Sequence, residues 1–156
     1  DLNSVDSGHW NAPQLLNKAE APSRARRVAD QDDVFFQSVR PYNMGHYHFT
    51  QKRDKQVVAS TGFIQARMRN GCNSFLYHLF FENSFNEKIN ILCTGSSYPA
   101  INATEFGKIA VPFPSAPEQR KIAECLDAIN DVIALSKAEL EKWRELKKGL
   151  LQQLFV

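Results

Sequence analysis

The chain has 156 residues, which suits one domain with an appendage and is cramped for two full domains. Hydrophobic residues make up 43% and charged residues 23%, so a sizeable core can form and wholesale disorder is excluded. The net charge of +2 by itself says little about partners. Because no apolar run approaches the roughly 20 residues of a membrane helix, no membrane partner is expected.

The first 114 residues predict a mixed domain with mainly antiparallel strands. Residues 1–33 are polar and indicate a loop with one short helix near 14–19. Runs rich in Val, Phe, Ile and Tyr, separated by Pro, Gly and Asp, then predict strands at 34–39, 46–49, 56–59 and 63–68. The following pattern predicts helices at 74–83 and 85–92, a loop at 95–99, a short helical turn at 104–107 and a strand at 108–111.

The last forty residues predict one long helix. Ser115 and Glu118 form a capping-box sequence, and Pro117 falls in the first turn, where its missing N–H costs nothing. From Ile122 a series of positions recurs at alternating spacings of four and three, which is the 3.5-residue period of a coiled coil. All of these positions are apolar except Ser136 and Lys147, which interrupt the series. The residues predicted to pair with another helix, here called the apolar seam, are Ile122, Leu126, Ile129, Ile133, Leu140, Trp143, Leu150 and Leu154.

A helix over residues 117–155 would reach about 58 Å at ~1.5 Å per residue, longer than the neighbouring domain is expected to be wide. Its apolar stripe needs a cover. A partner helix is the prediction, and folding of the seam back onto its own domain is the alternative.

Basic residues are concentrated between residues 40 and 69, where the only acid is Asp54 and the local net charge is +5. Aromatic residues are interleaved with them, as on surfaces that meet nucleic-acid phosphates. A solvated sheet face is the alternative interpretation of the same segment.

Catalytic and metal-binding patterns are not apparent. The sequence has no phosphate loop, no Gly-x-Gly-x-x-Gly after a strand and no His-Glu-x-x-His. His46 and His48 would share one face of a strand, but without further ligands nearby they are expected to be two half-exposed histidines. The cysteines Cys72, Cys93 and Cys125 include no Cys-x-x-Cys pair and fit a reducing compartment. We therefore expect a cytoplasmic protein that is not an enzyme and holds no metal or cofactor.

Residues 109–123 (IAVPFPSAPEQRKIA) resemble the junction in specificity (S) subunits of type I restriction–modification enzymes. In that family a strand ending in Pro-x-Pro runs into a helix with a Pro-x-x-Glu-Gln-like opening followed by Ile-Ala. Residues 146–155 (LKKGLLQQLF) are similar to the end of the same helix, and residues 33–41, 60–63 and 95–99 also match. The resemblance covers roughly residues 23–155.

The resemblance implies an α+β fold, with a DNA target recognition domain over residues 1–114 and a spacer helix that forms a coiled coil over 115–156. In the family a subunit has two such domains, each followed by a long helix, and the helices pack antiparallel. Each domain reads one half of a bipartite DNA target. The subunit is non-catalytic and carries modification subunits, which methylate adenine, and restriction subunits, which cut.

The chain departs from the family pattern in two ways. It has one recognition domain and one helix, and the usual opening strand is missing before Leu2, so the N-terminal part of the domain is expected to be absent. The alternatives are the C-terminal half of a subunit, an isolated domain, or a half-length subunit that dimerises. The partners implied are double-stranded DNA, modification subunits, the restriction subunit indirectly, and a second spacer helix from the same subunit or a homodimer.

Candidate DNA-binding residues follow from the basic segment and the matched loops. Phosphate contacts position a protein, whereas base-edge contacts give sequence preference, with Arg suited to guanine and Gln to adenine. The candidates are Arg40, Tyr42, Lys52, Arg53, Gln65, Arg67, Arg69, Ser97 and Tyr98. The rival hypothesis is a coiled-coil assembly adaptor whose mixed domain binds protein; its binding to duplex DNA would be weak and non-specific.

Overall fold

The computed structural model describes residues 2–6, 8–11, 15–17 and 19–155. In chain order its elements are η1 (Leu2–Ser4), β1 (Val5–Asp6), β2 (His9–Trp10), β3 (Ala25–Ala29), β4 (Asp33–Gln37), η2 (Pro41–Asn43), β5 (Tyr47–Phe49), β6 (Val57–Ser60), β7 (Phe63–Ala66), α1 (Asn73–Leu79), α2 (Asn83–Leu92), α3 (Ala103–Phe106) and α4 (Ala116–Leu154). The predicted α+β class with antiparallel strands and a long final helix is confirmed.

Strand β4 is the centre of the head, the name used here for residues 2–114 as far as the structure describes them. It pairs antiparallel with β5 on one side and β7 on the other, with Phe36 opposite Ile64. All five of its residues are buried, because both faces of the sheet are covered. The pairs β1–β2 and β3–β6 form two further antiparallel sheets.

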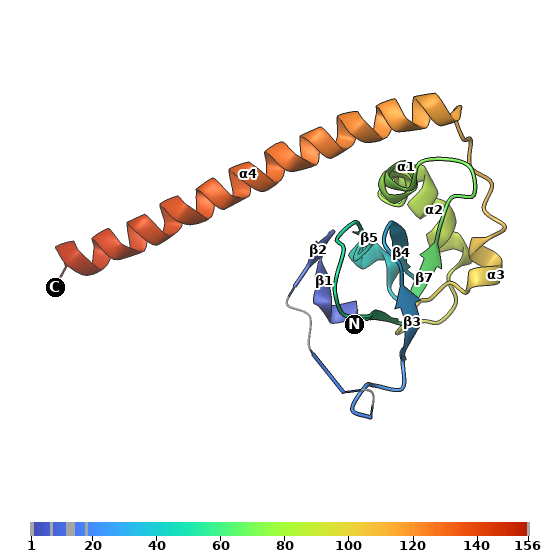
Figure 1. Cartoon of the computed structure of the whole chain (residues 1–156), viewed down its shortest axis with the longest axis horizontal. Coiled ribbons are helices and arrows are strands. Elements are labelled where there is room, and N and C mark those ends of the chain that lie inside the picture. The colour runs from blue at the N-terminus through green and yellow to red at the C-terminus, as the bar shows by residue number, and fades with distance from the viewer. Residues whose placement is uncertain (1, 7, 12–14, 18, 156) are drawn as a thin grey trace.

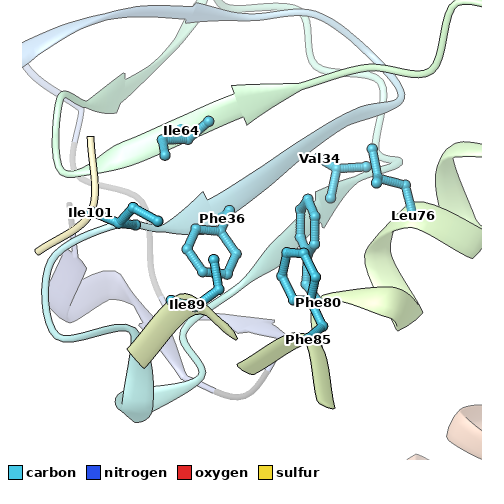
Figure 2. Close-up of a cluster of buried hydrophobic side chains, with 8 residues drawn as sticks. All are labelled: Val34, Phe36, Ile64, Leu76, Phe80, Phe85, Ile89 and Ile101. Carbon is cyan, nitrogen blue, oxygen red and sulfur yellow. The ribbon is translucent and has the colours of Figure 1, made fainter. Parts of the chain in front are cut away.

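Side chains on the two faces of β4 pack into two separate hydrophobic clusters. Side chains alternate along a strand, so Val34 and Phe36 point toward the helices while Phe35 points the other way. The helix-side cluster, drawn in Figure 2, is completed by Ile64, Leu76, Phe80, Phe85, Ile89 and Ile101. On the opposite face, Phe35 packs with Phe49 and Phe63 against residues of β1, β2, β3 and β6. The head is thus layered, with helices on one face of the central sheet and the small sheets on the other.

Two expectations about the secondary structure of the head are wrong. The strand expected at 108–111 does not form; its residues make no ladder, and Ile109 and Val111 pack their side chains against the helix-side cluster. Strand β3 lies within the segment predicted as a loop. It forms a strand because it pairs with β6, although its own sequence shows no strand pattern. The short helix expected at 14–19 falls partly outside the described residues, and residues 15–17 are not helical.

His46 differs from the half-exposed histidine that was expected. Its side chain is fully buried, and its ring stacks on Phe36 at a centroid distance of 4.3 Å. The Gln37 backbone N–H donates to its Nδ1 at 3.0 Å, so the neutral ring acts as an acceptor there. His48 is part-exposed and its Nε2 lies 2.7 Å from an Asp32 carboxylate oxygen. Within the described ranges, no three His, Cys, Asp or Glu side chains are grouped as metal ligands would be.

We expect acid to destabilise the protein through His46. Burial lowers its pKa from 6.5 to about 3. Between these values the unfolded chain binds a proton that the folded chain does not, so the free energy of unfolding falls as pH drops below 6.5. The slope due to this group approaches about 1.4 kcal/mol per pH unit, measurable by urea unfolding at a series of pH values.

The matched variants for this measurement are His46→Asn and His9→Asn. In His46→Asn the introduced amide oxygen can still accept from the Gln37 N–H but does not titrate, so the pH slope should flatten even if overall stability drops. His9 is exposed, and its replacement should leave the slope unchanged. An unchanged slope in His46→Asn would assign the acid sensitivity to other groups.

Helix α4 was predicted almost to its ends, at 117–155 against the observed Ala116–Leu154. The Glu118 carboxylate accepts from the Ser115 backbone N–H at 2.9 Å and from its hydroxyl, and these bonds lower the pKa of Glu118. The helix projects away from the head (Figure 1). None of the helices in the described residues combines the length and apolarity needed to span a bilayer.

The apolar seam is uncovered in this structure. Ile129 is 50% exposed, and the other seven seam residues are also exposed. The seam therefore does not fold back on the head, and its pairing with another helix stays a prediction. The placing of a domain boundary between residues 114 and 115 also stays a prediction.

Candidate nucleic-acid interface

Arg40 and the loop at 95–99 meet at the surface of the head. The Arg40 guanidinium carbon lies 4.1 Å from the centre of the Tyr98 ring, a cation–π contact. Its Nη2 donates to the Ser97 carbonyl oxygen at 3.4 Å, and its backbone N–H donates to the Pro99 carbonyl oxygen at 2.7 Å. Tyr98 remains 66% exposed. Three candidate residues, separated by nearly sixty positions, are thus joined in one cluster, here called the Arg40–Tyr98 cluster.

The backbone that presents Arg40 is strained and firmly held. Arg40 adopts a left-handed conformation, with φ at 51°, which is costly for a residue with a side chain. The Gln37 amide nitrogen, itself buried, donates to the Val39 carbonyl oxygen at 2.8 Å and to that of Arg40 at 3.2 Å. Tyr42 follows in η2 and is 53% exposed. The head therefore stabilises an unfavourable conformation at the residue that carries the guanidinium.

A second group of candidates lies on the loop between β5 and β6. The Arg53 guanidinium carbon lies 5.2 Å from the Trp10 ring centre, and its Nη2 donates to the Gln51 amide oxygen. Lys52 and Arg53 line a cavity of about 250 Å³ together with residues 28–31 and their own loop. Burial raises the pKa of Tyr47, and the nearby Arg53 charge opposes that rise.

The third group surrounds a buried carboxylate. Asp33 is fully buried, and it accepts from Arg67 Nε at 2.8 Å, from Gln65 Nε2 at 2.6 Å and from the Asp30 backbone N–H at 2.7 Å. Arg67 Nη2 also donates to Asp30, and these hydrogen bonds raise the pKa of Arg67. Gln65 Nε2 further donates to the Val28 carbonyl oxygen at 2.9 Å. Several donors of Arg67 and Gln65 are therefore already engaged within the head.

The candidate residues consequently differ in what they can still offer a ligand. The Arg67 side chain is 51% exposed, with Nε and Nη2 directed at carboxylates and Nη1 left for an outside partner. Arg69 follows β7 and is exposed. Whether any of these nine residues touches DNA stays a prediction.

Sequence reasoning missed Gln37 and Asp33, which hold Arg40 and Arg67 in place. Both flank the apolar run 34–36 and are buried, at 5% and 0% exposure. A polar side chain at the end of a buried strand must find hydrogen-bond partners. This rule could have identified Gln37 and Asp33 as residues that bind other side chains or backbone groups, although it does not predict which groups they bind.

Comparison with known proteins agrees with the fold. Residues 32–143 match the family described as the type I restriction modification DNA specificity domain. The match includes the central sheet, the helices of the head and most of α4. The chain belongs to this family, which confirms the resemblance predicted from residues 109–123.

Curated relatives and solved structures are similar over most of the chain. The MjaIX specificity subunit of Methanocaldococcus jannaschii is 27% identical over 94% of this chain and 37% of its own length. The HsdS subunit from Thermoanaerobacter tengcongensis superposes with a TM-score of 0.71 at 30% identity, over 85% of this chain and 35% of that one. A structure from work on complex assembly and conformational transition of the type I R-M system gives 0.74 at 25% identity, over 92% and 38%. The chain thus spans little more than a third of these relatives.

Proposed function

We propose that this chain reads DNA sequence for a type I restriction–modification complex. In this proposal residues 1–114 are a target recognition domain for one half of a bipartite target, and residues 115–156 are the spacer helix. The family match, which runs through both parts, carries the proposal. The chain contributes recognition and no catalysis of its own and needs no cofactor; modification subunits methylate adenine, restriction subunits are carried indirectly, and the complex works in the cytoplasm.

The surface of the head supports different roles for different candidate residues, with some contacting DNA phosphates and others contacting base edges. Lys52 and Arg53, on an exposed loop, suit the phosphate backbone, which attracts cations regardless of sequence. Arg40 suits a base edge, because its ring contact with Tyr98 and its strained backbone restrict where the guanidinium can point. A pre-positioned guanidinium loses less conformational freedom when it forms a bidentate pair with guanine.

The apolar seam supports the second half of the proposal. Eight exposed apolar residues in a 3.5-residue repeat form a surface that a second helix would cover. That helix belongs either to the same subunit or to a second copy of this chain, and the modification subunit docks on the resulting spacer.

Mapping of methylated adenines by long-read sequencing tests the proposal. The chain is co-expressed with its cognate modification subunit in cells, with the modification subunit alone as the control. A bipartite methylated motif that depends on the chain is the expected result, and a palindromic motif would indicate a symmetric pair of copies. Absence of methylation from soluble, co-purified proteins would overturn the proposal in favour of the assembly adaptor.

Arg40→Ala in the same assay separates base reading from phosphate contact, and Arg120→Ala on α4 is the matched control. If Arg40 reads a base, discrimination at one position of the motif should fall by ~1–3 kcal/mol. Equal weakening on all sequences would reassign Arg40 to the phosphates.

A further inference from the structure

Helix α4 is attached to the head by a short contact along its first three turns. Of the described residues of α4, only Gln119 and Ala123 are buried. Asp127 is part-exposed, and nearly every later residue is exposed. These three residues are spaced by four and lie on one face of the helix, against α1. The direction of the whole projecting helix therefore depends on this contact.

Gln119 supplies the first part of the contact. It is 4% exposed; its Oε1 accepts from the Cys72 backbone N–H at 3.1 Å, and its Nε2 donates to the Pro114 carbonyl oxygen at 2.9 Å. A Cβ at Gly71 would lie 2.6 Å from the same Oε1, so a larger residue at that position would have to displace the Gln119 amide. One amide thus joins α4 to the start of α1 and to the linker that precedes α4.

Asp127 supplies the second part, two helical turns further along. Its carboxylate accepts from the Ser74 hydroxyl, at 2.7 Å from Oδ2, and its Oδ1 lies 2.7 Å from His78 Nε2. Ser74 and His78 are one turn apart on α1 and face α4 together. Because hydrogen bonds are directional, this arrangement restricts rotation and sliding of α4 in a way that an apolar contact would not.

We propose that Gln119, Asp127, Ser74 and His78 form a joint that sets the direction in which α4 leaves the head. The consequence for DNA reading rests on the function proposed above. The 27 residues that follow Asp127 in α4 span about 40 Å at ~1.5 Å per residue. A change of about 10° at the joint would therefore move the far end of α4 by about 7 Å, or about two base-pair steps of duplex DNA. The four residues are positioning residues for half-site spacing.

Distance measurements by pulsed electron spin resonance test the joint without DNA. Spin labels are carried on unnatural amino acids at Asn90 on α2 and Lys137 on α4, both exposed, in the whole 156-residue chain diluted with unlabelled protein. Asp127→Ala should shift and broaden the distance distribution. Asp131→Ala, which removes the same charge one turn later at an exposed position, should leave the distribution unchanged.

A second variant and a second readout complete the test. Ser74→Ala removes one hydroxyl from the opposite side of the joint and should broaden the distribution in the same way, with circular dichroism confirming that the head is folded. Identical distributions for Asp127→Ala, Ser74→Ala and Asp131→Ala would overturn the joint. In the methylation assay, Asp127→Ala should relax the spacing between half-sites. Altered distances with unchanged spacing would overturn the positioning role, whereas absence of methylation by the unsubstituted chain would count against the proposed function alone.

Discussion

Phe36→Ala is expected to lower the free energy of unfolding by about 3–5 kcal/mol, the usual cost of truncating a buried phenylalanine. Phe36 is fully buried at the centre of the helix-side cluster (Figure 2). Its ring centre lies 5.1 Å from that of Phe80 and 4.8 Å from that of Phe106. Its loss would leave a cavity between the sheet and three helices, and would remove the stacking partner of His46. Urea unfolding followed by circular dichroism measures the change.

Ile91→Ala is the control for this substitution. Ile91 is on α2 but is 81% exposed, so its truncation should change stability by less than about 0.5 kcal/mol. A small effect at Phe36 would mean that packing around this ring contributes little to the stability of the head. Such a result would contradict the central place given to β4.

The double substitution of Ile129 and Ile133 by Asp should abolish helix pairing while leaving the head folded. Both side chains are exposed at 50% and 46%, so the isolated chain loses little packing when they change. In a paired helix both would be covered, and burying two unpaired carboxylates is strongly unfavourable. Light scattering should show loss of self-association, and co-purification should show loss of docking to the modification subunit.

The control places the same two charges on the outer face of α4. Ala134→Asp with Ala138→Asp has the same spacing and the same change in charge but lies off the apolar seam. It should leave association and docking intact. If the seam variant behaved like this control, the coiled-coil interpretation would be wrong, although the family membership would be unaffected.

Features that depend on local sequence were predicted well. The ends of α4 were predicted to within a residue, because capping residues, proline placement and apolar spacing act within a few turns of the helix. Strands β4 and β7 were predicted for a similar reason, since both are runs of Val, Phe and Ile. Their exact ends were not, because the ends depend on which partner strand is available.

Features that depend on distant partners were missed or misassigned. Strand β3 contains two arginines and shows no strong strand pattern; only its pairing with β6 makes it a strand. Residues 108–111 show the pattern of a strand, but their apolar side chains are buried by packing alone, and the carbonyl oxygen of Ala110 accepts from Lys88 instead of from a ladder. The sequence of a segment does not report whether a neighbouring backbone will be within reach.

The candidate interface also has a part that the sequence predicted and a part that only the folded structure showed. The amino-acid sequence was enough to identify the family, the class of fold, the long helix with its apolar seam, and the basic and aromatic residues available for binding. Folding was needed to bring Arg40 to Tyr98 across nearly sixty residues, to engage Arg67 and Gln65 with buried Asp33, and to join α4 to α1 through Asp127. Composition and spacing specify what a side chain can donate or accept. Which of those donors and acceptors are already satisfied depends on contacts between distant segments, and these exist only once the chain has folded.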